Sequence, residues 1–85
     1  MKKSFVIYNK NLNLSVGNND CSFNLPNDFH QSYGVLLVRA WPLSTWANAY
    51  VTMTCDRTLI EGDSKVQLYA GAAQSYNIWV LLLYT

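Results

Sequence analysis

The sequence predicts an all-β fold: a small antiparallel β-sandwich or jelly roll of about seven strands, in a single domain over residues 1–85. Apolar and polar residues alternate with a period of two through most of the chain, which is the pattern of half-buried strands. Clusters of Gly, Asn, Asp and Ser interrupt the alternation roughly every 8–12 residues, as turns do in sandwiches and small barrels. No window has the 3.6-residue period of an amphipathic helix.

The first quarter of the chain contributes three of the expected strands. Residues 4–8 form a short β-branched and aromatic run, and residues 11–16 alternate between Leu or Val and polar side chains. Residues 17–20, Gly-Asn-Asn-Asp, are a strong turn signal, and residues 21–25 alternate again directly after it. The second and third segments are therefore expected to pair as a hairpin with a four-residue loop.

The middle of the chain predicts a loop at residues 26–34 and then a strand. Residues 35–38 are apolar on both faces, which is typical of a central strand, and Pro42 ends this strand because proline cannot donate to a ladder. Arg39 lies in this otherwise apolar run. We expect its side chain either to extend outward to solvent or to pair with a carboxylate.

The second half of the chain supplies the remaining strands. Residues 49–55 alternate cleanly, and a turn at residues 61–64 leads into residues 65–70, where Val, Leu and Ala occupy one face. A second turn, at residues 71–75, precedes the last strand at residues 76–84. Each of these segments has the length and alternation of a half-buried strand.

The last strand carries the most information about assembly. Asn77 is its only strongly polar residue, so both of its faces are apolar. Such a strand at the edge of a monomer would template aggregation, so it lies either between two sheets or against another copy of the chain. Oligomerisation is a common way to stabilise a chain with so small a core, and it produces closed, symmetric assemblies. The predicted interface residues are Ile78, Trp79, Leu81 and Leu83.

Composition and charge limit the possible partners. Only 13% of residues are charged and the net charge is +1, which excludes a basic surface for nucleic acid. No stretch is long and apolar enough to insert into a membrane, and the apolar run at residues 5–8 is too short for a signal peptide. Neutral polar residues, nine Asn among them, replace the missing charges. This composition is common in proteins that work outside cells.

Enzyme function has almost no support in the sequence. His30 is the only histidine, and it lies in a predicted loop without the nucleophile and carboxylate that a catalytic triad requires. The carboxylates all fall in predicted turns, where aspartate is expected for local hydrogen bonding; they are Asp20, Asp28, Asp56, Glu61 and Asp63. We therefore predict a protein that is not an enzyme and uses no cofactor.

The two cysteines, Cys21 and Cys55, fall on inward-facing positions of their strands. A disulfide between them would join two strands. The missing secretion signal instead favours two free, buried thiols that pack as small apolar side chains. The chain has no Cys-x-x-Cys pair and a single histidine, so we predict no metal site.

Aromatic and amide side chains gather in two segments, residues 29–33 and 41–50. A sugar ring presents C–H groups on one face and hydroxyls at its edge, and it suits flat aromatic surfaces beside amides. The alternative is that the aromatic residues fill the ends of the core. The predicted ligand-binding residues are Tyr33, Trp41, Trp46, Asn48 and Tyr50.

The Asn-, Ser- and Thr-rich turns, the missing signal and the apolar final run from Asn77 to Thr85 make the chain resemble the C-terminal tip domains of bacteriophage tail fibres and tailspikes. The resemblance is one of pattern across most of the chain, without a diagnostic motif. It implies a homotrimeric β-sandwich or jelly roll that holds three fibre chains in register and binds cell-surface polysaccharide or protein.

The same resemblance implies a place on the virion tail, or outside the cell after lysis, without a signal peptide. It also implies that the chain is a fragment of a longer fibre. The alternative is a small, stand-alone, sugar-binding protein of the lectin kind, of which residues 1–85 are the whole.

Overall fold

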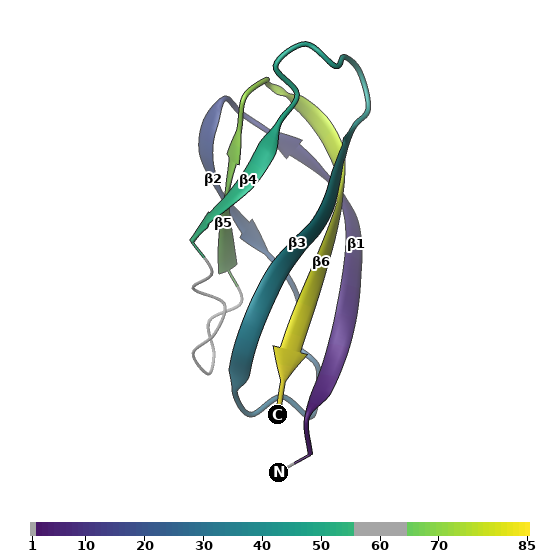
Figure 1. Ribbon diagram of the computed structural model, residues 1–85, viewed down its shortest axis with the longest axis vertical. Coiled ribbons are helices and arrows are strands. Elements are labelled where there is room, and N and C mark those ends of the chain that lie inside the picture. The colour runs from purple at the N-terminus through teal and green to yellow at the C-terminus, as the bar shows by residue number, and fades with distance from the viewer. Residues whose placement is uncertain (1, 56–64) are drawn as a thin grey trace.

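The computed structural model describes residues 2–55 and 65–85, which form six strands in two antiparallel sheets (Figure 1). The strands are β1 (Ser4–Leu14), β2 (Gly17–Ser22), β3 (Ser32–Pro42), β4 (Val51–Cys55), β5 (Lys65–Ala70) and β6 (Gln74–Tyr84). The first sheet, which we call sheet A, has the order β1-β6-β3, and sheet B has the order β2-β5-β4. The all-β prediction is confirmed. The turn expected at residues 61–64 lies outside the described residues.

The described residues form six strands and not the seven expected, because residues 4–14 form one continuous strand. The sequence predicts a break at residues 9 and 10, but both pair in register with β6. Asn9 lies on the solvent face of the sheet, and Lys10 lies on the other face, where its Nζ donates to the Ser22 carbonyl at 3.1 Å. Polar side chains with solvent or a hydrogen-bond partner do not interrupt the backbone ladder, so a polar run is a weak strand terminator.

Residues 11–25 do not form the expected hairpin. β1 and β2 follow one another closely in the chain, but β1 pairs with β6 and β2 pairs with β5. Gly17, at a φ of 101°, lets the backbone turn from one sheet into the other. Asn19 fixes this corner, because its Oδ1 accepts from the Ser15 backbone N–H at 2.9 Å and its Nδ2 donates to the Ser15 carbonyl at 3.0 Å.

β6 is the central strand of sheet A and pairs with β1 along its full length. Its burial alternates strictly, which explains why both faces are apolar: one face fills the core and the other forms the outer surface of sheet A. Ile78, one of the residues predicted at an interface, is fully buried on the core face. It is therefore not available to another copy of the chain.

Both sheets contribute to one core, and Figure 1 shows them facing each other. Val66, Leu68 and Ala70 of β5 point inward, as their alternation predicted, and are almost completely buried. Cys21 is a free, buried thiol, and burial followed by the charge of Asp20 raises the pKa of that thiol. The side chain of Cys55 lies outside the described part of the structure.

Candidate functional site

The outward side chains of sheet A form two chemically different halves. Near the chain termini they are large and apolar, and we call this the apolar half; its members are Phe5, Ile7, Leu36, Leu81 and Leu83. In the sheet register Phe5 lies opposite Leu83, and Leu81 lies between Ile7 and Leu36. Phe5, Ile7 and Leu36 are 65%, 51% and 55% exposed. The apolar half is therefore a candidate interaction surface.

Three of the predicted interface residues, Trp79, Leu81 and Leu83, lie on this outer face and are half-buried. The sequence did not identify the exposed side chains that flank them on β1 and β3. Residues 4–8 are almost entirely apolar, so their alternation does not say which positions point outward. Only the pairing with β6, which is distant in sequence, places Phe5 and Ile7 on the same surface as Leu81.

The other half of the same face carries a ladder of amides. Asn77 donates from its Nδ2 to the Oδ1 atoms of Asn9 and Asn11, both at 2.8 Å. Its own Oδ1 accepts from the indole Nε1 of Trp79 at 2.7 Å. We call this region the polar half; it comprises Asn9, Asn11, Asn77 and Trp79 together with Arg39 and Trp41 of β3.

A bulge in β3 brings Arg39 and Trp41 into the polar half. The register shifts between Leu37 and Arg39, which makes Val38 the extra residue. Leu36 faces outward before this bulge, and Arg39 and Trp41 face outward after it, as bulges commonly re-aim side chains. Arg39 extends outward, one of the two alternatives considered for it, and its guanidinium lies 4.1 Å from the centre of the Trp41 ring.

The loop at residues 43–50, at the end of the molecule opposite the termini, carries Trp46 (Figure 1). Buried Gln74 holds this loop: its Oε1 accepts from the backbone N–H groups of Ser44 and Thr45 at 2.9 and 3.0 Å, and its Nε2 donates to the Thr45 carbonyl at 2.8 Å. Trp46 is 67% exposed, and its ring stands perpendicular to that of Trp41 with the centroids 4.8 Å apart. Trp41, a member of the polar half, and Trp46 therefore form one aromatic surface at the edge of that half.

Asn48 and Tyr50 lie at the end of the same loop that leads into sheet B. Asn48 adopts a left-handed backbone conformation with φ of 56°, which asparagine tolerates better than most residues. Tyr50 stacks on Tyr69 of sheet B with the ring centroids 6.1 Å apart. A Cβ added to Gly71 would lie 2.5 Å from the Asn48 carbonyl oxygen, so glycine is needed for this close approach. These contacts connect the loop to sheet B.

Tyr33 lies far from the other predicted ligand-binding residues. It is separated from Trp41 by eight positions of β3, which the two bulges shorten to about 20 Å along the strand. Its ring contacts the Lys3 ammonium, whose Nζ is 5.3 Å from the ring centre. The five predicted ligand-binding residues therefore do not form one site: the structure brings Trp41 and Trp46 together, places Asn48 and Tyr50 toward sheet B, and leaves Tyr33 at the opposite end.

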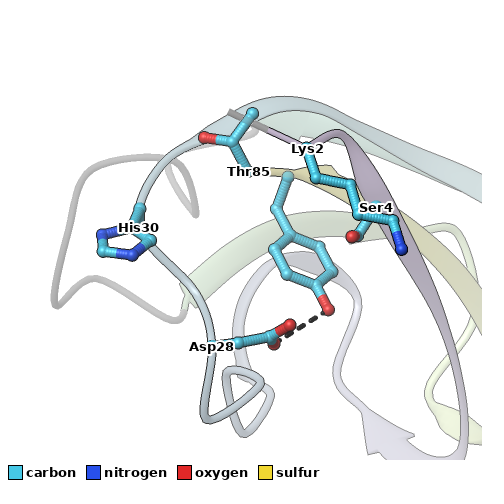
Figure 2. A pocket seen from close by; sticks show the side chains of 6 residues that line it. Lys2, Ser4, Asp28, His30 and Thr85 are labelled. Atoms are coloured by element: carbon cyan, nitrogen blue, oxygen red, sulfur yellow. Dashed lines mark hydrogen bonds between the residues drawn. The ribbon is translucent and has the colours of Figure 1, made fainter.

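A pocket of about 260 Å³ lies beside the chain termini and is lined by Lys2, Ser4, Asp28, His30, Tyr84 and Thr85 (Figure 2). Tyr84 donates its hydroxyl to Asp28 Oδ1 at 3.0 Å. Burial, followed by this hydrogen bond and the charge of Asp28, raises the pKa of the Tyr84 hydroxyl above 10.0. The imidazole of His30 points away from the pair (Figure 2), so the three side chains do not form a proton relay.

Residues 2–55 and 65–85 contain no group of three or more His, Cys, Asp and Glu side chains placed to hold a metal ion. The same residues include no helix long and apolar enough to cross a membrane. Comparison with protein-family models, curated proteins and solved structures gave no match to this chain.

Proposed function

We propose that this chain is a non-enzymatic β-domain that associates with copies of itself through sheet A and binds a cell-surface glycan. Its role is that of a trimerisation and receptor-binding domain of a phage tail fibre or tailspike. The apolar half of the outer face of sheet A is the observation that carries the proposal. Five large apolar side chains from three strands meet there without a charged residue among them. An identical copy presents a surface of matching chemistry.

The outer face of sheet A suits a ring of three copies. Its apolar half extends over about 14 Å of three strands spaced by about 4.8 Å, which gives roughly 200 Å² per copy. This surface alone is below the size of stable interfaces, so side chains that flank it on sheet A must be buried as well. In a ring of three each copy contacts two others, and the three apolar halves enclose a common core. The elongated shape, 44 by 17 by 15 Å, suits copies that pack side by side.

The aromatic surface of Trp41 and Trp46 supports the binding half of the proposal. An exposed indole beside amide and hydroxyl groups offers a sugar ring an apolar platform and hydrogen-bonding partners. The buried Gln74 clamp fixes the loop that carries Trp46, so little ordering of this loop is needed on binding. The neutral polar composition fits a location on the virion tail, or outside a cell after lysis.

A second candidate function is that of a small, stand-alone, sugar-binding protein of the lectin kind. One observation favours it: the amide ladder and both tryptophans of the aromatic surface belong to a single copy of the chain. Binding by this surface does not require another copy. A monomer that binds glycan would therefore support the lectin-like function and overturn the trimeric one.

Adsorption to polysaccharide-bearing cells tests the binding half of the proposal. Trp46→Ala should reduce adsorption about tenfold or more, because it removes the exposed stacking platform. Tyr33→Ala is the matched control, since it removes an exposed aromatic ring at the opposite end of β3 and should leave adsorption unchanged. Equal adsorption of the Trp46→Ala variant and the unaltered protein would contradict the assignment.

A further inference from the structure

The amides of the polar half have a fixed orientation. The indole Nε1 of Trp79 can only donate a hydrogen bond, so the atom of Asn77 that faces it at 2.7 Å must be the accepting Oδ1. The Nδ2 of Asn77 then points to Asn9 and Asn11, which must offer their own Oδ1 atoms. Trp79 therefore sets the direction of all three amides.

This orientation leaves two amide donors open on the surface. The Nδ2 groups of Asn9 and Asn11 point away from Asn77, and neither donates to any residue in the described part of the chain. Both side chains are exposed. Each Nδ2 carries two N–H bonds, so the polar half presents hydrogen-bond donors and calls for a ligand rich in acceptor oxygens.

The register of sheet A arranges these donors beside aromatic rings and one cation. One cross-strand row runs from Asn11 through Asn77 to Trp41, and the adjacent row runs from Asn9 through Trp79 to Arg39. Two strand spacings make each row about 10 Å wide, which is close to the length of a disaccharide. Sugar rings that lie across the rows would contact both the indoles and the open amides.

Arg39 gives this surface a charge without a counter-ion among the described residues. The described carboxylates are engaged elsewhere: Asp20 accepts from Gln67 on sheet B, and Asp28 accepts from Tyr84 near the chain termini. The Arg39 guanidinium stacks on Trp41 at 4.1 Å. Stacking occupies the face of a guanidinium and leaves its N–H edge free, the geometry that binds a carboxylate with two parallel hydrogen bonds.

We infer that the polar half binds a saccharide that carries a carboxylate, with Arg39 on the acid group and Asn9 and Asn11 on hydroxyl or ring oxygens. The inference rests on the proposed glycan-binding function and specifies the class of glycan. Uronic and sialic acid units share the required chemistry, an acid group on an acceptor-rich ring. The bulge at Val38 is what turns Arg39 toward the amides.

Binding to immobilised polymers tests the inference. One arm compares polygalacturonate with its methyl-esterified form, which keeps the rings and removes the charge; a second arm uses polysialic acid in place of the uronate. The unaltered chain should bind at least one acidic polymer about tenfold or more tightly than the esterified one, the effect of one charge-assisted hydrogen bond. Which acidic polymer binds identifies the source of the carboxylate.

Two variants make the test specific to the site. Arg39→Gln should remove the preference for the acidic polymer. Lys65→Gln removes the same charge from sheet B, where Lys65 is exposed, and should keep the preference. Equal binding of acidic and esterified polymers, or a preference that survives Arg39→Gln or is lost in Lys65→Gln, would overturn the inference.

The failures of the inference and of the proposed function are distinguishable. Binding to the esterified polymer that is lost in Trp46→Ala would keep the glycan-binding function and overturn the role of the carboxylate. Binding to none of the polymers would overturn the inference, and adsorption to cells would then decide whether glycan binding survives. Self-association depends on the other half of the face, so the mass of the assembly tests it separately.

Discussion

The outer faces of the two sheets differ in the side chains that they expose to water. On sheet B the outward side chains are polar and bond to one another: Thr54 Oγ1 donates to Asn18 Oδ1 at 3.0 Å, and Gln67 Nε2 donates to Asp20 Oδ1 at 3.3 Å. On sheet A the apolar half has no hydrogen-bonding side chain, and its members on the edge strands are more than half exposed. The outer face of sheet B therefore carries polar groups with hydrogen-bond partners, whereas half of the outer face of sheet A is exposed and apolar.

This difference shows where a small core can gain stability. The inner faces of both sheets are already filled by one cluster of buried side chains. A group of exposed large apolar side chains lies on sheet A, where covering each of them would contribute about 1 kcal/mol or more. Association through the apolar half of sheet A would therefore add to the apolar burial of the chain.

The largest expected effect comes from placing charges on the two faces in turn. Ile7→Lys combined with Leu36→Lys puts two ammonium groups where copies should meet, and the mass measured by light scattering should fall to that of the monomer. Both positions face solvent within one copy, so the fold should persist. Thr52→Lys combined with Gln67→Lys makes the same change on sheet B and should leave the mass unchanged. An unchanged mass in the sheet A variant would refute the role of the apolar half.

The second effect compares two glutamines. Gln74 of sheet A is buried and makes three hydrogen bonds to the loop at residues 43–50, so Gln74→Ala should lower the free energy of unfolding by about 2–4 kcal/mol. Gln67 of sheet B is half-buried and has two long side-chain hydrogen bonds, to Asp20 at 3.3 Å and from Thr54 at 3.4 Å, so Gln67→Ala should cost about 0.5 kcal/mol or less. Urea unfolding at a fixed protein concentration measures both. Equal losses of unfolding free energy in the two variants would contradict the role of Gln74 in holding the loop.

The third effect compares the connection between the sheets with an edge strand of sheet A. Gly71→Ala places a methyl group against the backbone carbonyl of Asn48, which cannot move without the loop, and should cost about 1–3 kcal/mol. Gly34→Ala places a methyl group 3.2 Å from the Cδ1 of Leu83, a side chain free to rotate, and should cost less. Thermal unfolding compares the stabilities of the two variants. A larger loss of stability in Gly34→Ala than in Gly71→Ala would contradict the requirement for glycine at position 71.

The smallest effect concerns pH. The pKa of Tyr84 is raised above 10.0 chiefly by burial and then by Asp28, so its neutral form stabilises the fold below pH 10.0, and this contribution is lost as the pH rises through the folded-state pKa. Tyr84→Phe should therefore lose stability less steeply than the unaltered protein above pH 10.0. Asp28→Asn should fall between the two, because the burial of Tyr84 remains. Urea titrations at successive alkaline pH values measure the slopes, and identical slopes would exclude this role for Tyr84.

The sequence was sufficient for local features of the fold and insufficient for its pairings. Alternation identified the inward face of β5, because Val66, Leu68 and Ala70 lie in one uninterrupted strand. The hairpin at residues 11–25 was wrong, because its turn signal does not say whether the chain returns in the same sheet. The sequence predicts a break at residues 9 and 10, because the hydrogen-bonding partner that makes this segment a strand is β6, far away in sequence.

The candidate site depended still more on contacts that spacing does not report. The amide ladder joins Asn9 to Asn77 across 68 positions, and Arg39 reaches it only through the bulge at Val38. The separation of Tyr33 from Trp41 follows from β3 beginning at Ser32, whereas the sequence predicts a loop over residues 26–34 that leaves the position of Tyr33 open. Trp41 and Trp46 were predicted together and lie in contact because one short loop connects them.

Sedimentation equilibrium of the unaltered chain tests the central claim, that copies of the chain cover the apolar half of sheet A. Three copies of a 9.7 kDa chain have a mass of about 29 kDa, and this is the mass we expect throughout the micromolar range. A single species of 9.7 kDa over that range would show that copies of the chain do not associate through the apolar half, and it would contradict this claim.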